Sequence, residues 1–567
     1  MSRLAILVQA VGLLPAVAAV SWAAGASPEQ AGVVAEIERL GGKVTVDLES
    51  PDKAVIGVDL TRAEVTDAGL RRLSGLPRLQ SLELALTDIT DARLEHLKGL
   101  TGLQSLGLRG TFITDAGLEH LQGFSRLQSL NLTHTRITGA GLRHLKGLTR
   151  LQSLNLAFTA WLTDEGLRHL QELPQLQSLD LEGTAVKGLE YLQALPKLQS
   201  LDLTYTWVTD AGLERLKGLA NLQSLSLVGD NVTDAGLEHL KDLTNLQSLD
   251  LASTKVRGLE GIEGLAKLQS LNLSTTDVAD AELEHLKGLA NLRSLDLTLT
   301  LVTDAGLEHL QGLTRLQSLG LSKAVTDAGI ERLKGLTNLQ SLNLVSGGVT
   351  DAGLEHLQGF NKLQSLNLGY TQVSGSGLEH LKRLPQLQGL DLQYTELTDA
   401  GLEHLQGLTG LQSLNLTATA ITDAGLKHLQ GLTRLQSLDL RYTKMTDAGL
   451  RHLEGLTDLQ SLFLCRTTVT GAGLSHLQGL IRLQELNLGE TRVADAGLAR
   501  LQGLVQLQTL DLSSTKVSDA GLKHLAGLRS LRSLALYSTN VTDVGARELQ
   551  RALPACHVEG AFRHSRE

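Results

Sequence analysis

Residues 103–126 read LQSLGLRGTFITDAGLEHLQGFSR, and residues 411–434 read LQSLNLTATAITDAGLKHLQGLTR. The two stretches are nearly identical although about three hundred residues separate them. Aligned on the LQSL start, the chain contains twenty-one such copies, mostly 24 residues long, from a divergent first copy at Val55 to a last copy that begins at Leu531. Repetition at a fixed period of this length predicts a solenoid of stacked units.

The spacing of the leucines predicts what each copy forms. Leu411, Leu414 and Leu416 start a short strand, in which Leu414 and Leu416 lie two apart and so face the same side. Thr419 follows where the chain must turn away from that strand, and we expect its hydroxyl to bind backbone groups that the turn leaves without partners. The first half of each copy is therefore predicted to be a strand and a turn.

The second half of each copy has the pattern of a short helix. Thr422 or Asp423 is expected to cap its N-terminus. Leu426, Leu429 and Leu432 are spaced so that the apolar stripe of the helix faces inward. About seven aliphatic side chains per copy, at roughly 1.5–3 kcal/mol each, do not offset a backbone entropy cost of about 1–2 kcal/mol for each of its residues. One copy cannot fold alone, whereas stacked copies share a continuous core.

The L-x-x-L-x-L core of Leu411, Leu414 and Leu416 resembles that of the leucine-rich-repeat family. The likeness covers roughly residues 55–554 and is greatest to long bacterial repeat proteins with a T-D-A-G-L segment; it is weaker to the cysteine-containing repeats of F-box proteins. The resemblance implies an α/β solenoid, a curved right-handed superhelix with parallel strands on the concave side and short helices on the convex side. It also implies a protein-binding scaffold rather than an enzyme.

The ends of the chain differ from the repeats and suggest four segments. Residues 1–26 are predicted to be a signal peptide and residues 27–54 an N-terminal cap of one helix and one strand. The repeats occupy residues 55–554, and residues 555–567 are expected to add a closing strand and a tail. Two copies, residues 176–197 and 246–267, are two residues shorter and lack the T-D-A-G sequence.

The predicted signal has three parts. Arg3 supplies a positive charge, residues 4–20 are mostly apolar, and small residues allow cleavage after Ala23 or Ala26. An uncleaved membrane anchor is the alternative, since the apolar stretch approaches the ~20 residues that span a bilayer. No second apolar run follows, so the mature chain is expected to lack a membrane span and to be secreted, periplasmic or on the cell surface.

The composition argues against a nucleic-acid partner and against a disulfide. The net charge is −10, and the sequence has no run rich in Lys or Arg, so nucleic acid is not an expected partner. Cys465 and Cys556 lie several repeats apart, too far for a disulfide, which needs Cα atoms within about 7 Å. The sequence has no glycine-rich loop of the phosphate-binding kind, and no cofactor is predicted.

One row of histidines runs along the predicted helices. Each lies on a different helix with no second His or Cys one turn away, and neighbouring helices are about 8–10 Å apart, so no metal site is predicted. We expect the row to gain positive charge as the pH falls towards 5. The row consists of His96, His120, His144, His169, His239, His285, His309, His356, His380, His404, His428, His452, His476 and His524.

A row of Asn and Asp occupies the strand position between the second and third leucines. Calcium requires an oxygen cage that a flat row does not form, and a pair of carboxylates repeated many times is not a unique catalytic site. Serine recurs in every LQSL, so no single nucleophile stands apart. No catalytic residue is predicted, and the row is interpreted as structural or as part of a binding surface. It includes Asn131, Asn155, Asp180, Asp202, Asp250, Asn272, Asp296, Asn343, Asn367, Asp391, Asn415, Asp439, Asn487 and Asp511.

Specificity for a partner must come from positions that break the repeat. The two places after the third leucine vary most, and five of the six tyrosines of the chain lie there. Tyr and Arg are enriched in interface hot spots. Alternatively, the tyrosines occur there because β-propensity favours them at a strand edge. The candidate binding residues are Phe158, Tyr205, Tyr370, Tyr394, Arg441, Tyr442, Phe463 and Arg466.

The sequence therefore predicts an exported scaffold that binds a protein or a glycan on its concave face. A structural or adhesion protein of the cell envelope is one alternative, and it predicts self-association. A ubiquitin-ligase substrate receptor or effector like the F-box repeat proteins is another, although residues 27–54 are too few for an F-box. The partner's identity, the oligomeric state and the biological process are not specified by the sequence.

Overall fold

The structure is a computed structural model that describes residues 28–50, 53–229 and 231–560. The predicted signal peptide lies outside these residues. The chain divides into two compact units, here called unit 1, up to Leu249, and unit 2, from Asp250 onward. None of the described helices is long and apolar enough to cross a membrane.

In unit 1, one short strand per repeat pairs in parallel with the strand of the next repeat. Equivalent residues face each other, as Leu130 of one repeat does with Leu154 of the next. The strands are β1 (Lys43–Val46), β2 (Val55–Asp59), β3 (Ser81–Glu83), β4 (Ser105–Gly107), β5 (Ser129–Asn131), β6 (Ser153–Asn155), β7 (Ser178–Asp180), β8 (Ser200–Asp202) and β9 (Ser224–Ser226). Only β1 is antiparallel to its neighbour, β2, among these strands.

Unit 2 repeats the same arrangement, and β10 (Ser248–Asp250) lies at the division. Leu414 of one strand faces Leu438 of the next. The strands are β11 (Ser270–Asn272), β12 (Ser294–Asp296), β13 (Ser318–Gly320), β14 (Ser341–Asn343), β15 (Ser365–Asn367), β16 (Gly389–Asp391), β17 (Ser413–Asn415), β18 (Ser437–Asp439), β19 (Ser461–Phe463), β20 (Glu485–Asn487), β21 (Thr509–Asp511), β22 (Ser533–Ala535) and β23 (His557–Glu559).

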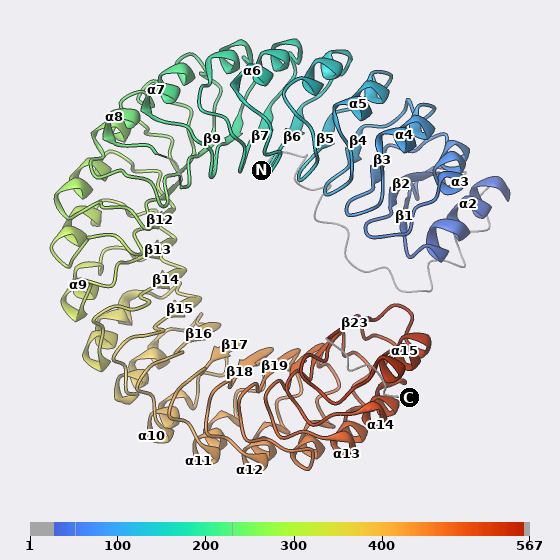
Figure 1. Cartoon of the computed structure of the whole chain (residues 1–567). Helices are drawn as coiled ribbons and strands as arrows, with labels where there is room; N and C mark the ends of the chain where they lie inside the picture. Colours follow the sequence, from blue (N-terminus) through green and yellow to red (C-terminus); the bar gives the residue numbers. More distant parts are fainter. Residues whose placement is uncertain (1–27, 51–52, 230, 561–567) are drawn as a thin grey trace. The chain divides into compact units, whose positions relative to one another are not determined.

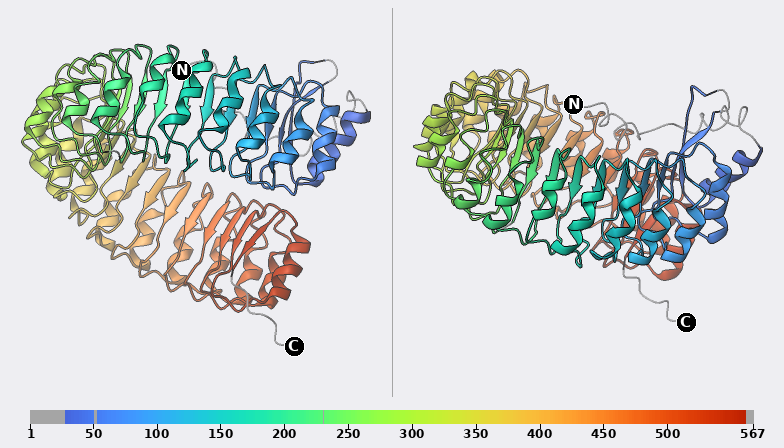
Figure 2. Two further views of the ribbon diagram at one scale, coloured as in Figure 1. Left: turned by 45° about the horizontal axis from the view of Figure 1, so that its top comes forward. Right: turned by 90° about the horizontal axis from the view of Figure 1, so that it is seen from above.

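Short helices lie on the side of each unit opposite the strands. Figures 1 and 2 show the strands on the inner face and the helices on the outer face of each unit. The α-helices are α2 (Pro28–Arg39), α3 (Asp67–Arg72), α4 (Asp91–Leu94), α5 (Asp115–Leu118), α6 (Asp164–Leu167), α7 (Asp210–Leu213) and α8 (Asp234–Leu237) in unit 1, and α9 (Asp327–Arg332), α10 (Asp399–Leu402), α11 (Asp423–Leu426), α12 (Asp447–Leu450), α13 (Asp495–Leu498), α14 (Asp519–Leu522) and α15 (Asp543–Ala552) in unit 2.

The helices are shorter than the leucine spacing predicts. A typical repeat has one α-helical turn, such as α11, followed by one 3-10 turn, Lys427–Leu429. Some repeats, among them residues 176–197 with Glu190–Ala194, have only 3-10 turns. Tighter 3-10 turns place side chains three residues apart on one side, so Leu426, Leu429 and Leu432 are all fully buried. The α/β solenoid with a shared leucine core is thereby confirmed.

The turn and the helix cap show what the polar consensus residues do. Thr419 is buried, and its hydroxyl donates to the carbonyl of Leu416 at 2.8 Å, as predicted. The cap of α11 is Thr422, whose Oγ1 accepts from the N–H of Ala424. Asp423 does not cap this helix through its side chain; its carboxylate instead accepts from the N–H and the hydroxyl of Thr446, in the next repeat, at 2.7 and 2.6 Å.

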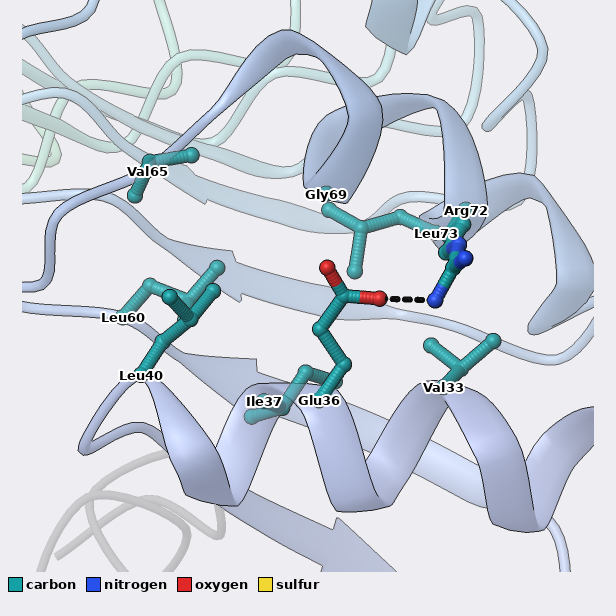
Figure 3. A pocket seen from close by; sticks show the side chains of 9 residues that line it. All are labelled: Val33, Glu36, Ile37, Leu40, Leu60, Val65, Gly69, Arg72 and Leu73. Atoms are coloured by element: carbon teal, nitrogen blue, oxygen red, sulfur yellow. Dashed lines mark hydrogen bonds and ion pairs between the residues drawn. The ribbon is translucent and has the colours of Figure 1, made fainter.

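The N-terminal helix α2 packs against the first repeat. Figure 3 shows the small, largely apolar pocket between them, where Val33 and Ile37 of α2 face Leu73. An ion pair joins Glu36 to Arg72 across its rim. At the other end of the chain, β23 pairs in parallel with β22. Cys556 lies buried just before β23, and burial raises the pKa of its thiol to about 11.

Candidate ligand-binding surface

One residue in nearly every repeat has a left-handed backbone. It is the second residue after the third leucine, and in unit 2 the row it forms includes Tyr370, Tyr394, Ala418, Tyr442, Arg466 and Glu490, with φ between 53° and 59°. We call this the edge row. Its backbone N–H donates to the next repeat: that of Tyr394 to the carbonyl of Thr417 at 2.8 Å, and that of Tyr442 to the carbonyl of Cys465 at 3.0 Å. This hydrogen bond between repeats holds the two tyrosines in place.

The left-handed conformation bears on why tyrosines occur in the edge row. It costs a residue with a Cβ roughly 1–2 kcal/mol, and β-branched or bulky residues are rare in it. The explanation by β-propensity fails, because Tyr370, Tyr394 and Tyr442 are not in an extended conformation. Local backbone preference therefore does not account for aromatic rings at these positions.

The rings of neighbouring repeats stack. The centroids of Tyr370 and Tyr394 are 4.5 Å apart and their planes differ by 8°. In unit 1, His134 and Phe158 stack in the same way, at 4.5 Å and 6°. This distance is close to the spacing of neighbouring strands, so the repeat itself brings two adjacent aromatic rings into contact. Each ring limits the movement of the other.

Two arginines of unit 2 lie over aromatic rings. The Cζ of Arg441 is 5.6 Å from the centroid of Phe463, and the Cζ of Arg466 is 5.0 Å from that of Tyr442. Both charges are paired: Arg441 donates through Nη2 to Asp439 at 2.6 Å, and Arg466 through Nε to Glu490 at 2.5 Å. Cation–π contact and ion pairing together hold the two guanidinium groups in fixed positions.

The eight candidate residues do not all belong to the same unit. Six of them, from Tyr370 to Arg466, lie in unit 2, on repeats that begin between Leu363 and Leu459. Phe158 and Tyr205 belong to unit 1, where each ring covers the glycine that follows it in the edge row. A Cβ at Gly183 would lie 2.7 Å from the ring of Phe158, and one at Gly229 would lie 2.5 Å from the ring of Tyr205.

The Asn and Asp row of the strands has a structural role. Asn415 accepts from the N–H of Thr417 at 3.0 Å and donates to Asp391 at 3.1 Å, so it fixes the turn after its own strand and contacts the neighbouring repeat. Burial raises the pKa of Asp391 and of Asp180 above the ordinary value. Phe463 stands where this row would place Asn or Asp, so β19 has no such contact and gains an aromatic ring instead.

The histidine row contacts the preceding repeat. The amide of Gln430 lies 3.0 Å from Nδ1 of His452, and Glu263 forms a short ion pair with Nδ1 of His285. Among the described residues, Glu260, Glu282 and His285 could each bring one ligand atom within 4.8 Å of the others. His285 forms ion pairs with Glu260 and Glu263, and we assign no metal to the cluster.

Besides Tyr537, three exposed aromatic residues were not among the sequence-based candidates. Phe112, Trp161 and Trp207 lie in unit 1, just after the turn threonine of their repeats, where the side chain is exposed. The sequence does single them out, because most other repeats have a small or polar residue at the place where these three have an aromatic ring. They were missed because the place after the turn threonine is also variable elsewhere.

Sequence comparisons identify the repeats. The family described as "Leucine-rich repeat region" matches residues 201–427, "Leucine rich repeat" matches residues 101–160, 125–186 and 409–469, and "Leucine Rich repeat" matches residues 506–526. No curated protein matches the chain.

Solved structures of repeat proteins resemble the chain. The mouse RP105/MD-1 complex contains a chain that is 19% identical, with a TM-score of 0.52, over 87% of this chain and 92% of that one. An internalin from Listeria monocytogenes is 24% identical, with a TM-score of 0.41, over 62% and 90%. The leucine-rich-repeat protein LIC12759 from Leptospira interrogans is 19% identical, with a TM-score of 0.31, over 87% and 98%. At these identities the similarity concerns the fold.

Proposed function

Because the chain is a leucine-rich-repeat protein, we propose that it is an exported, non-enzymatic scaffold that binds a macromolecular partner on the inner face of unit 2. Stacked repeats present an extended surface of this kind. The partner is a protein or a glycan. The proposal of export rests on the charged Arg3, the apolar residues 4–20 and the small residues before Ser27.

The observation that supports the binding surface most directly is the set of tyrosines in the edge row. Tyr370, Tyr394 and Tyr442 occupy left-handed positions, which the backbone disfavours for bulky residues, and all three side chains remain exposed. A cost in stability at three positions whose side chains stay 43–50% exposed favours selection for binding.

The arrangement also suits tight binding. The Tyr370–Tyr394 stack and the contact of Arg466 with Tyr442 hold these side chains in place before a partner arrives. Immobilising a flexible side chain on binding costs roughly 0.5–1.5 kcal/mol. Side chains that are already held avoid most of this cost, as rigid aromatic contacts do in antibody paratopes.

The test is affinity capture from the surface of the cells that make the protein, with the wild-type chain and with a Tyr394→Ala/Tyr442→Ala double variant. We expect the variant to lose the captured partner. A Ser514→Ala/Ser538→Ala double variant is the matched control, since both serines lie in the edge row and have left-handed φ but no ring. Equal capture by the tyrosine variant would contradict the proposed surface.

Two further measurements separate the alternatives. Sedimentation velocity of the wild-type chain should show a discrete species. Self-association that the tyrosine substitutions do not change would favour a structural protein of the envelope.

N-terminal sequencing should show that the mature protein begins just after Ala23 or Ala26. A mature protein that begins at Met1 in the cytoplasm would contradict export.

A further inference from the structure

A second row of residues runs along one flank of unit 1, apart from the edge row. We call it the flank row: Phe112, Arg136, Trp161, Ala185 and Trp207, one from each of five successive repeats. Parallel bridges join Thr114 to Arg136 and Thr138 to Trp161. The N–H of Ala185 donates to the carbonyl of Leu162 at 3.2 Å, and the N–H of Trp207 to that of Val186 at 2.9 Å. The backbone pairing therefore keeps the row in regular order.

The aromatic residues occupy alternate places in the flank row. Phe112, Trp161 and Trp207 are each two repeats from the next, and two strand spacings come to about 10 Å. Their exposed fractions are 47%, 70% and 60%. Arg136 and Ala185 occupy the places between them. The row is thus an evenly spaced line of three aromatic side chains that do not contribute to the core.

The sequence of the Trp161 repeat explains its exposure. Residues 159–162 read TAWL where residues 419–421 of a regular repeat read TAI, so this repeat has one extra residue. Leu162 is fully buried, as is Ile421 at the corresponding place, and Trp161 is exposed. The repeat that follows, residues 176–197, is short and contributes the small Ala185 beside the two tryptophans. The irregular repeats of unit 1 lie next to the aromatic row.

Two cations lie against the rings of the row. The Cζ of Arg136 is 5.5 Å from the centroid of Phe112, and the Nζ of Lys187 is 5.2 Å from that of Trp207. Within the described part of the chain, neither side chain forms an ion pair with a carboxylate. Both can therefore donate hydrogen bonds to a ligand that lies along the rings.

We propose that the flank row binds an extended β-1,4-linked polysaccharide strand. In such a strand alternate sugar rings present the same face, and the disaccharide length is close to the two-repeat spacing of the row. Every second sugar would then stack its C–H face on Trp161, or on the faces of Phe112 and Trp207 that Arg136 and Lys187 leave free, while these two cations donate to oxygens of the strand. Flat, pre-arranged aromatic faces suit stacking of this kind. The site is separate in sequence and in residues from the edge row of unit 2.

The probes are cellohexaose, chitohexaose and, as an α-linked control that is not extended, maltohexaose. They are titrated into the mature full-length chain by calorimetry and by tryptophan fluorescence, which reports mainly on Trp161 and Trp207 once residues 1–26 are removed. We expect at least one β-linked hexasaccharide to bind and to change the fluorescence, and maltohexaose not to bind. Trp161→Ala and Trp207→Ala should each weaken binding roughly tenfold.

A matched control and a spacing variant sharpen the test. Leu301→Ala removes a side chain that is 58% exposed from the equivalent place in unit 2 and should leave binding unchanged. Ala185→Trp/Trp207→Ala keeps the number of rings but moves one by a single repeat, and it should bind as weakly as Trp207→Ala.

Four outcomes would overturn the proposal: no binding of either β-linked sugar at millimolar concentration, equal binding of maltohexaose, unchanged binding by the spacing variant, or a fluorescence response only to phosphatidylglycerol vesicles. None of them affects the tyrosine test of unit 2, so failure here is distinguishable from failure of the proposed function.

Discussion

Gly425, in the T-D-A-G-L segment, lies against Asp399 of the preceding repeat. A Cβ at this position would lie 2.4 Å from Oδ1 of Asp399 and 3.1 Å from its Cα, so the aspartate or the backbone would have to move. Gly431, in the same repeat, has nothing within 4 Å of where a Cβ would lie. The two glycines therefore recur for different reasons, although the repeat pattern presents them alike.

We expect Gly425→Ala to lower the free energy of unfolding by about 1–3 kcal/mol, because the added methyl group overpacks the contact between repeats. Gly431→Ala should instead raise it by about 0.4–1 kcal/mol, because alanine narrows the unfolded ensemble at no steric cost. Urea unfolding monitored by circular dichroism measures both. Equal effects of the two substitutions would contradict the close approach of Asp399.

Thr417 has a buried hydroxyl that makes no hydrogen bond within the described part of the chain. Thr133 occupies the same place in its own repeat, and its hydroxyl donates to Asn131 and Asn155 at 2.7 and 2.6 Å. At Thr417 the acceptor in the next repeat would be Asp439, but the two oxygens of that carboxylate accept from Nε and Nη2 of Arg441. The arginine of the candidate surface thus leaves a neighbouring polar group unsatisfied.

Thr417→Val should therefore raise the free energy of unfolding by about 1 kcal/mol, because it removes a buried polar atom without changing the shape of the side chain. Thr133→Val should lower it by about 1 kcal/mol, because that hydroxyl is satisfied. Thermal unfolding of the two variants side by side gives the comparison. If both lose stability, the hydroxyl of Thr417 has a partner.

At the scale of the elements, a ladder of side chains joins the outer helices of successive repeats. Asp399 binds the N–H and hydroxyl of Thr422 at 2.8 and 2.5 Å, and Asp423 repeats the contact with Thr446. Each of these threonines also lies at the N-terminus of its own helix. One residue pair per repeat therefore starts a helix and fastens it to its neighbour.

The histidines of these helices should not titrate together. A hydrogen bond with Glu263 raises the pKa of His285, whereas burial, with the nearby Arg451, lowers the pKa of His452. As the pH falls, His285 should gain its proton first and His452 late. The favourable contact of His285 is present below its unfolded pKa of about 6.5 and is lost as the pH rises through the raised folded value.

Nuclear magnetic resonance of a chain with carbon-13-labelled histidine would follow both residues. Glu263→Gln should lower the pKa of His285 towards the ordinary value and leave that of His452 unchanged. His285 and His452 should therefore gain their charges in different ranges of pH. A single shared midpoint for the two histidines would contradict this assignment.

The sequence predicted those features that each repeat determines within itself. Burial of Leu426 and Leu429 follows from their spacing, and the hydroxyl of Thr419 binds three residues back in the chain. The role of Asp423 could not be predicted so directly, because its partner Thr446 lies 23 residues further on.

The edge row was predicted as a set of variable positions, but its conformation was not. The left-handed φ recurs even at Thr275 and Leu299, which disfavour it. Glycine, which favours the conformation, occupies the position at Gly110, Gly183 and Gly229, but most repeats have a residue there that does not signal it. Likewise, the extra residue before Leu162 is visible in the sequence, but the exposure of Trp161 follows only from how that repeat packs.

At the scale of the whole molecule, stability should be distributed repeat by repeat. Each described repeat pairs its strand with the next one and shares leucines such as Leu438 with its neighbours. A solenoid of this kind is held by contacts between adjacent repeats, with few contacts between distant ones. A local loss of packing should therefore weaken nearby repeats most.

We expect Leu438→Ala, in β18, to cost about 2–5 kcal/mol locally, because it leaves a cavity in the buried leucine layer. Hydrogen–deuterium exchange of the full chain should speed up most in the repeats of β17, β18 and β19 and progressively less in more distant ones, while the amides of unit 1 keep their wild-type rates. Leu301→Ala, which removes an exposed leucine, should leave exchange unchanged throughout. If Leu438→Ala accelerated exchange equally across both units, the chain would unfold as one cooperative body, and the nearest-neighbour account of its stability would be wrong.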